Sequence, residues 1–328
     1  MKKQLLGSGL LLIAAGVWGF AFAFQSIAME HIGAFYYSAI RFMLGGFVLT
    51  PFLFVRSKAA ATVTEPQTAV NKSGFSTFLN KHRALLIGGL LCGAILAIAA
   101  NLQQLGINHL NGVNVGKAGF LTVLYIVIVP IFGLFLHKKC PVVIWCALPI
   151  ALVGLYLLCG GISTDGFSFG LDDIFLISCA FFYSFHIMAI DHFAPKVDPI
   201  KLSCLQFWIC GLITLIIAVF VETVTWEAIR LALPGILFGG IGSCGIAFTL
   251  QSVGQKFISP AVASLCMSFE STFSVLGGWL LQHTPLSTSE MIGCACMFVV
   301  IMTVNLEPFV RAAIQKKRAE KEARSRSL

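Results

Sequence analysis

The sequence predicts an all-α integral membrane protein with ten transmembrane helices, arranged as two inverted five-helix repeats. Three observations indicate this fold: the composition, a series of ten apolar segments, and two short internal matches. Of the 328 residues, 58% are hydrophobic and 11% are charged, and the mean hydropathy is +0.90. A soluble domain carries roughly a quarter charged residues. The length leaves room for roughly ten spans, at about 20 apolar residues per span.

The apolar segments follow one another along the chain with short polar connections. We expect each to be a helix, because the hydrocarbon core of a bilayer offers backbone groups no external partner. The first five segments are approximately Leu5–Met29, Ala34–Val55, Ala84–Ile107, Gly112–Leu136 and Pro141–Leu158. The second five are approximately Ile174–Ile190, Ile200–Val221, Leu231–Gly254, Pro260–Leu281 and Leu286–Leu306.

The first segment resembles a signal peptide, because Lys2 and Lys3 precede its apolar run and small residues follow. That run exceeds the roughly 7 to 15 residues of a signal sequence. We therefore expect a retained first helix.

The distribution of basic residues predicts the orientation, since basic connections stay on the cytoplasmic side. With the N-terminus inside, the inner connections and the C-terminal tail hold all but three of the 22 lysines and arginines. The exceptions are Arg230 in an outer connection and Arg41 and Lys117 within spans. We expect a multi-pass plasma (inner) membrane protein with both termini cytoplasmic.

An internal repeat emerges when the two halves are compared. Ser38-Ala39-Ile40-Arg41-Phe42 with Gly46 resembles Ser203-Cys204-Leu205-Gln206-Phe207 with Gly211, and Leu102-Gln103-x-x-Gly106 resembles Leu250-Gln251-x-x-Gly254. The matches fall in the second and seventh, and in the third and eighth, segments. Five is an odd number, so the second copy enters the membrane from the opposite side, as in many transporters. We expect one repeat over residues 4–160, the other over 168–308, and a basic cytoplasmic tail over 309–328.

Several motifs resemble the EamA-type branch of the drug/metabolite transporter (DMT) superfamily, over roughly residues 4–308. They are Trp18-Gly19-Phe20-Ala21-Phe22, Arg41-Phe42, Ala118-Gly119-Phe120-Leu121-Thr122 through Pro130, Ser259-Pro260-Ala261, Phe269-Glu270 and Gln282-His283-Thr284-Pro285. The resemblance implies a transporter of polar metabolites or amino acids with two five-helix repeats and cytoplasmic termini.

The chain departs from the family pattern at two places. The family often has Glu-Pro in the ninth helix, where this chain has Glu270-Ser271, and the missing proline predicts a less kinked helix. The family also has Gly-Glu-Arg or Gly-Glu-Lys after the fourth helix, where this chain has His137-Lys138-Lys139.

Three charged residues within the spans are the leading candidates for substrate binding, because charges are costly at membrane depth. Glu270 near mid-span would bind a cationic group or take and release a proton. Its structural alternative is a carboxyl group that accepts hydrogen bonds from Ser268 or Ser271 and ties helices together. Arg41 and Lys117 would bind a carboxylate or phosphate. Their alternatives are pairing of Arg41 with Glu270 or with helix-end carbonyls, and extension of Lys117 to the interface.

A second group of candidates consists of aromatic and polar side chains within a few turns of mid-span. Such residues suit an amphiphilic pocket, although many polar residues in membrane proteins face neighbouring helices instead. This group is Trp18, Phe22, Tyr37, Asn101, Gln104, Tyr125, Tyr183, His186, Gln206 and Gln251.

The favoured function is a secondary transporter, exchanging or proton-coupled, that moves a small anionic or zwitterionic metabolite such as an amino acid by alternating access. The alternative is a multidrug exporter of lipophilic cations. The two intramembrane cations beside one carboxylate disfavour that alternative.

Other classes of function find little support in the sequence. A membrane-embedded enzyme is disfavoured because no HExxH, GxSxG or Walker sequence is present. The eleven cysteines form no CxxC and indicate packing residues, so we expect no metal or cofactor. The basic residues lie in connections and not in a patch with stacking aromatics, so we expect a small-molecule substrate and the lipid bilayer as partners, and no nucleic acid.

Overall fold

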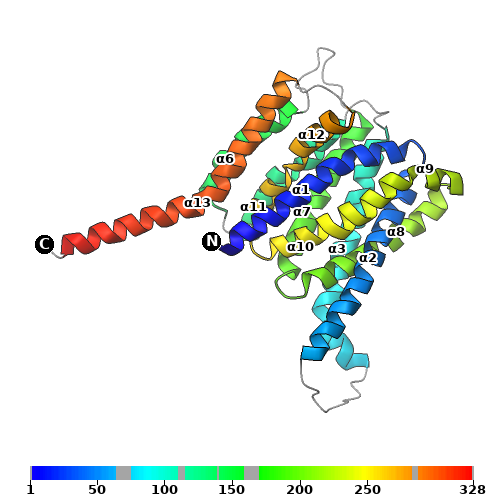
Figure 1. Cartoon of the computed structure of the whole chain (residues 1–328), viewed down its shortest axis with the longest axis horizontal. Coiled ribbons are helices and arrows are strands. Elements are labelled where there is room, and N and C mark those ends of the chain that lie inside the picture. Colours follow the sequence, from blue (N-terminus) through cyan, green and yellow to red (C-terminus); the bar gives the residue numbers. More distant parts are fainter. Residues whose placement is uncertain are drawn as a thin grey trace.

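A computed structural model describes the backbone of residues 2–63, 75–109, 115–138, 140–158, 170–282 and 287–326. The first repeat contains α1 (Lys2–Met29), α2 (Ala34–Val63), α3 (Phe75–His109), α4 (Val115–Val123), α5 (Tyr125–Phe135) and α6 (Val142–Leu158). The second contains α7 (Leu171–Phe193), α8 (Pro199–Val221), α9 (Trp226–Leu237), the π-helix η1 (Phe238–Phe248), α10 (Thr249–Gln255), α11 (Pro260–Met267), α12 (Glu270–Gln282) and α13 (Thr288–Arg326). Figure 1 shows these helices packed into one bundle.

The described helices make the ten spans that the sequence predicts. By length and composition, 8 of them are able to cross a membrane, counting α4–α5 and α9–η1–α10 each as one span. The shorter apolar helix α6 and the interrupted α11–α12 complete the ten. The fold class is therefore confirmed, and the chain is a multi-pass membrane protein. Residues 283–286, which include part of the Gln282–Pro285 motif, lie outside the described residues.

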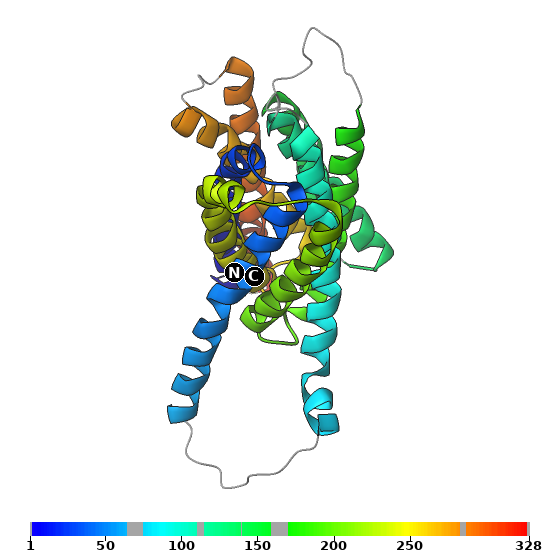
Figure 2. The same ribbon diagram turned by 90° about the vertical axis from the view of Figure 1, so that its right-hand side faces the viewer.

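Some helices are longer than the apolar segments that predict them. Figure 2 shows α2 and α3 extending past the other helices, toward the connection between them. The helix α13 continues from its span into the predicted tail and ends at Arg326. An apolar segment predicts only the part of a helix that crosses lipid. Where the helix continues into water its residues are polar, so the apolar pattern does not predict where it ends.

The packing of the helices has the symmetry of an inverted repeat. The second helix of each repeat packs on the other, as α2 on α8, and the fifth helices pair as α6 on α13. The third helix of one repeat packs on the first helix of the other, as α3 on α7 and as η1 and α10 on α1.

The contacts of individual glycines show the same symmetry between the two repeats. A Cβ added to Gly46 would lie 3.0 Å from the Trp208 side chain, and one added to Gly211 would lie 2.6 Å from the Met43 side chain. In the same way Gly254 packs against Gly7 and Leu11, and Gly106 packs against Asp172 and Leu176. The two sequence matches thus correspond to equivalent helix contacts.

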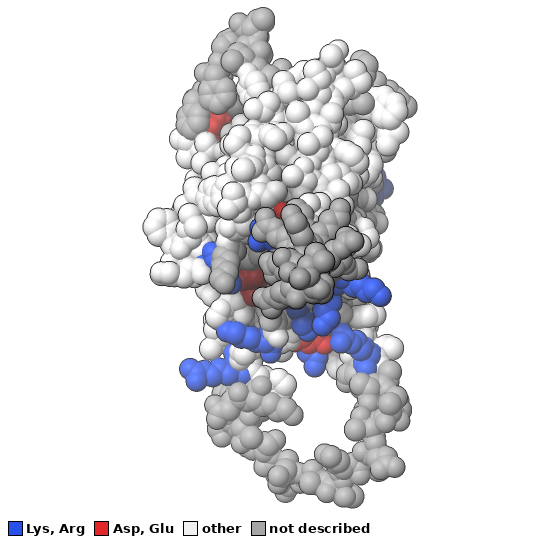
Figure 3. Space-filling view, turned by 90° about the vertical axis from the view of Figure 1, so that its left-hand side faces the viewer, with Lys and Arg blue, Asp and Glu red and all other residues white. Residues whose placement is uncertain are grey.

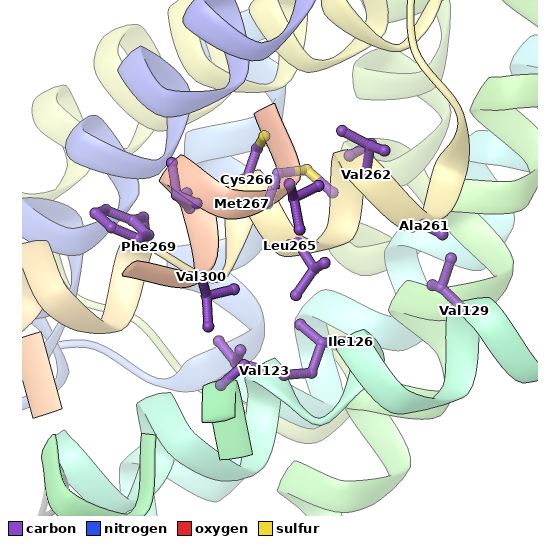
Figure 4. Packing of buried hydrophobic residues seen from close by; sticks show 14 of the residues in the cluster. Val123, Ile126, Val129, Ala261, Val262, Leu265, Cys266, Met267, Phe269 and Val300 are labelled. Atoms are coloured by element: carbon purple, nitrogen blue, oxygen red, sulfur yellow. The ribbon is translucent and has the colours of Figure 1, made fainter. Parts of the chain in front are cut away.

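The largest buried cluster lies where the fourth and ninth spans meet the fifth and tenth. Val129 lies beside Ala261 of α11, Val123 lies beside Val300 of α13, and Ile126 lies between them on the side of Leu265 (Figure 4). These side chains are all apolar, so their packing holds the spans together. It does not indicate which end of the bundle faces which side of the membrane.

Exposed basic residues mark one end of the bundle, called here the basic end. On the face shown in Figure 3 the lysine and arginine side chains gather in the lower part of the molecule, and most of the upper part carries no charge. The exposed basic residues that define the basic end are Lys2, Lys3, Arg56, Arg83, Lys138, Lys196, Lys201, Lys256 and Arg311.

Candidate functional site

A cavity lies between the two repeats and is walled by seven of the ten spans. The space within it that is open to water-sized molecules is about 50 Å³, enough for a few water molecules. The wall consists of Trp18, Phe22 and Gln25 of α1, Arg41 of α2, Gln103 of α3, Thr122 of α4, Tyr125 of α5, Tyr183 and Ile187 of α7, Ser243 and Phe248 of η1, Gln251 of α10, Met267 of α11 and Glu270 of α12.

Arg41 is the cation of this cavity, and its side chain is buried and oriented. Its Nη1 donates a hydrogen bond to Oε1 of Gln25 at 2.9 Å. The guanidinium carbon lies 5.2 Å from the ring centroid of Tyr37 and 5.0 Å from that of Phe42, distances at which aromatic faces attract a cation. Its Nε has no hydrogen-bond partner in the structure. The guanidinium is therefore held in place and keeps a free donor.

Glu270 is the acidic residue of the cavity and begins α12. The Tyr125 hydroxyl donates a hydrogen bond to Glu270 Oε1 at 3.3 Å. Ser268 does not bond to this carboxylate as one structural alternative requires, because its hydroxyl donates to the carbonyl of Leu265 at 2.8 Å. The position at the first turn of α12 also favours negative charge, because a helix N-terminus carries partial positive charge.

The ninth span is interrupted directly before Glu270 by a short turn, and the comparison of its kink with that of the family's Glu-Pro helix stays a prediction. α11 ends at Met267 and α12 begins at Glu270. Phe269 N bonds to the carbonyl of Cys266 and Ser271 N to that of Ser268, which tightens the chain into a narrower turn. Serine hydroxyls that bond to carbonyls of the preceding turn compete with the helix hydrogen bonds, which favours this turn in the absence of a proline.

The two charges of the cavity are not paired with each other. The ion pairs among the described residues include neither Arg41 nor Glu270. Two further wall atoms are buried without a partner, the indole Nε1 of Trp18 and the amide Oε1 of Gln251. Buried polar groups are rarely left unpaired, so this wall has the unused donors and acceptor that a bound polar molecule would satisfy.

Seven predicted candidates lie on the cavity wall, and the side chain of Lys117 lies outside the described residues. Those on the wall are Trp18, Phe22, Arg41, Tyr125, Tyr183, Gln251 and Glu270. Tyr37, Asn101, Gln104, His186 and Gln206 lie behind it.

The candidates behind the wall mostly join helices. The Asn101 amide donates to the carbonyl of Ala97 at 2.7 Å and to Thr214 Oγ1 at 2.8 Å. His186 Nε2 and Gln206 Oε1 are 2.9 Å apart. The amide of Gln104 is fully buried, and neither of its polar atoms has a partner in the structure.

The wall also contains residues that the sequence reasoning missed. These are Gln25, Gln103, Thr122, Ile187, Ser243, Phe248 and Met267. One of them carried a signal: Gln103 stands opposite Gln251 in the repeat match, and both line the cavity. Gln103 Oε1 accepts a hydrogen bond from Tyr183 at 3.0 Å.

Comparisons with known proteins agree with the fold and the repeat. A model of the EamA-like transporter family matches residues 5–160 and again residues 171–306. An uncharacterized transporter of Archaeoglobus fulgidus is 24% identical over 310 residues, which cover 93% of this chain and 87% of that protein. A crystal structure of a protein that is 17% identical has a TM-score of 0.69 and covers 92% of this chain and 96% of that chain, and thus shares the fold. Because the family model matches nearly the whole chain in two copies, the chain belongs to the EamA-like transporter family.

Proposed function

We propose that this transporter moves a small anionic or zwitterionic metabolite, such as an amino acid, by alternating access. The observation that carries the proposal is that Arg41 and Glu270 line one cavity between the repeats without an ion pair joining them. An isolated buried charge costs several kcal/mol unless a partner compensates it. A substrate with a carboxylate for Arg41 and an ammonium group for Glu270 would supply both partners at once.

The orientation in the proposal follows from the basic end. Basic connections remain cytoplasmic, so the basic end faces the cytoplasm, both termini lie there, and the protein sits in the plasma (inner) membrane. Exchange against a second substrate or coupling to a proton at Glu270 would drive net movement.

The experiment begins with purified full-length protein and a thermal-shift screen of the twenty amino acids, dicarboxylates and sugar phosphates. Compounds that stabilise the protein are then tested for saturable uptake into proteoliposomes. We expect hits among compounds that carry a carboxylate or phosphate. Arg41→Gln should reduce their affinity by about tenfold or more, because hydrogen bonds to charged groups contribute about 1.5–3 kcal/mol.

The matched control is Arg230→Gln, since Arg230 is exposed and pairs with Glu227 three residues away. Such surface pairs contribute little, so affinity should not change. Absence of stabilisation and of saturable flux for the whole panel would overturn the proposal.

A second candidate is export of lipophilic cations. Trp18, Tyr125 and Phe248 line the same cavity as Glu270, and aromatic faces attract cations. Uptake of ethidium that requires Glu270 but is insensitive to Arg41→Gln would favour this candidate over the first.

A further inference from the structure

The first two helices of each repeat correspond without a gap. The glycine contacts equate Gly7 with Asp172 and Gly46 with Gly211, and the helix starts equate Ala34 of α2 with Pro199 of α8. These pairs share one separation along the chain. The residue before each second helix, Gly33 or Asp198, therefore occupies the same position in its repeat.

The two repeats satisfy the first amide groups of that helix differently. In α8, Asp198 caps its own helix, because its Oδ1 accepts from Ile200 N at 2.9 Å and from Lys201 N at 3.5 Å. In α2 the equivalent amides belong to Phe35 and Tyr36, and the equivalent cap residue, Gly33, has no side chain.

Glu222 of the other repeat supplies the missing cap. Its Oε1 accepts from Phe35 N at 3.1 Å and its Oε2 accepts from Tyr36 N at 2.9 Å. A Cβ on Gly33 would lie 2.3 Å from the Glu222 carboxyl carbon, so the carboxylate occupies the space that a side chain at Gly33 would need. Glu222 ends α8, and its own amide bonds to Ala218 O at 2.9 Å.

This cap joins the two repeats at the end of the bundle away from the basic end. α2 of the first repeat and α8 of the second pack on each other, and the cap links the start of α2 to the end of α8. At the basic end the same pair of helices is joined by an ion pair, Arg56 Nη2 to Asp198 Oδ2 at 3.0 Å. The α2–α8 contact is thus tied at both ends, by different chemistry.

We propose that Glu222 is a latch that holds the cavity closed at the end opposite the basic end. In alternating access by an inverted repeat, one repeat moves against the other, so the repeats separate at one end and then at the other. Separation at this end breaks both carboxylate hydrogen bonds at once, because the donors lie in the first repeat and the acceptor lies in the second. Arg41 follows Tyr36 on α2 by about 7.5 Å of helix rise, so release of the latch also frees the segment that positions the cavity cation. The proposal rests on the alternating-access function proposed above.

The test separates the latch from an ordinary helix cap. Glu222→Ala removes both. The double variant Gly33→Asp/Glu222→Ala returns a cap in cis, as Asp198 does in α8, and leaves no hydrogen bond from residue 222 to α2 at this end. Gly33 has an ordinary φ, and the loss of the carboxylate at position 222 makes room for the new side chain.

Two measurements on full-length protein in nanodiscs need no substrate. The first is hydrogen exchange of the Phe35 and Tyr36 amides, which reports the cap. The second is the labelling rate of a cysteine introduced at Ser243 in the cavity wall, measured with a water-soluble maleimide and corrected for labelling of the parent chain. Arg56→Gln is the matched control, because it releases the tie at the other end.

In Glu222→Ala we expect exchange and labelling each to rise by about tenfold, the scale of a lost cap. In the double variant exchange should return to the parent value while labelling stays raised. Arg56→Gln should leave exchange at Phe35 and Tyr36 unchanged.

If hydrogen exchange and cysteine labelling both return to parent values in the double variant, Glu222 acts only as a helix cap and the latch proposal is wrong. Unchanged labelling in Glu222→Ala would do the same. Neither measurement depends on a substrate, so failure of the panel screen with raised labelling would remove the proposed substrate class and keep the latch.

Discussion

The Tyr37 hydroxyl donates a hydrogen bond to the carbonyl oxygen of Gly235, with 3.2 Å between the oxygens. Tyr37 is fully buried on α2, and Gly235 lies in α9 just before the π-helix begins. The bond joins α2 to the eighth span, which consists of α9, η1 and α10 and carries the wall residue Ser243 in η1. Because the Tyr37 ring also lies beside the Arg41 guanidinium, Tyr37 positions the cavity wall without being part of it.

Tyr37→Phe and Trp18→Phe should therefore differ in their effect on ligand affinity. Tyr37→Phe keeps the ring beside Arg41 but leaves the Gly235 carbonyl without its side-chain donor, so we expect a loss of about 1 kcal/mol in stability and little change in ligand affinity. Trp18 Nε1 has no partner to lose, but its ring packs against Phe248, so Trp18→Phe should lower stability through lost packing and in addition weaken ligand binding. Thermal melting with and without a compound from the screen measures both. Equal losses of affinity in the two variants would contradict this division.

The reciprocal glycine contacts between α2 and α8 predict the effect of a single methyl group. A Cβ at Gly211 would lie 2.6 Å from Met43 Cγ, so Gly211→Ala should destabilise the protein by about 1–3 kcal/mol, the usual cost of overpacking. Met43→Ala removes the clashing atom, and the double variant should recover part of the loss. Gly9→Ala is the matched control, since nothing lies within 4 Å of a Cβ there. Additive losses in the double variant would refute the contact.

The sequence predicted the ten spans and two charged residues that line the cavity, whereas the side chain of the third charged candidate, Lys117, lies outside the described residues. A charge at membrane depth is so unfavourable that Arg41 and Glu270 stood out without a structure, and both line the cavity. The repeat matches likewise identified equivalent positions, because Gly46 and Gly211 each pack against the second helix of the other repeat.

Neutral polar residues could not be assigned in this way. Gln104 and Gln103 are adjacent and equally polar, yet one residue turns the side chain by about 100° around a helix, and Gln103 lines the cavity whereas Gln104 does not. Gln251 is the residue of the second repeat that matches Gln103. Comparison of the two repeats would therefore have identified Gln103, and not Gln104, as the cavity residue. The π-helix over Phe238–Phe248 has no simple pattern, because its wider turn depends on contacts such as that between Gly240 and Leu44.

The neighbouring amides of Asn101 and Gln104 predict stability changes of opposite sign. Gln104 is fully buried, and its amide has no partner in the structure, so Gln104→Met removes an unsatisfied group and should stabilise the protein by about 1–3 kcal/mol. Asn101→Leu breaks the bonds to Ala97 and Thr214 and should destabilise it by about 1 kcal/mol. Thermal melting in detergent compares the two. A destabilised Gln104→Met protein would mean that the amide is satisfied in the membrane.

The end of α5 explains one departure from the family pattern and gives the last prediction. His137 has a φ of 54° and stands where the family has the glycine of its Gly-Glu-Arg turn. Lys138 N donates to the carbonyl of Gly133 at 2.7 Å, a bond that closes the helix end and requires the left-handed conformation at His137. A side chain in that conformation costs about 1–2 kcal/mol. His137→Gly should relieve part of this cost and stabilise the protein by about 1 kcal/mol.

The matched control is Leu136→Gly, because Leu136 has an ordinary φ of −89°. Glycine there relieves no strain and increases the entropy lost on folding, so this variant should be less stable than the parent protein. Thermal melting of the two single variants beside the parent would show opposite shifts. If both variants melt at a lower temperature, the left-handed residue carries no strain and the family's glycine serves another purpose, such as room for the glutamate that follows it.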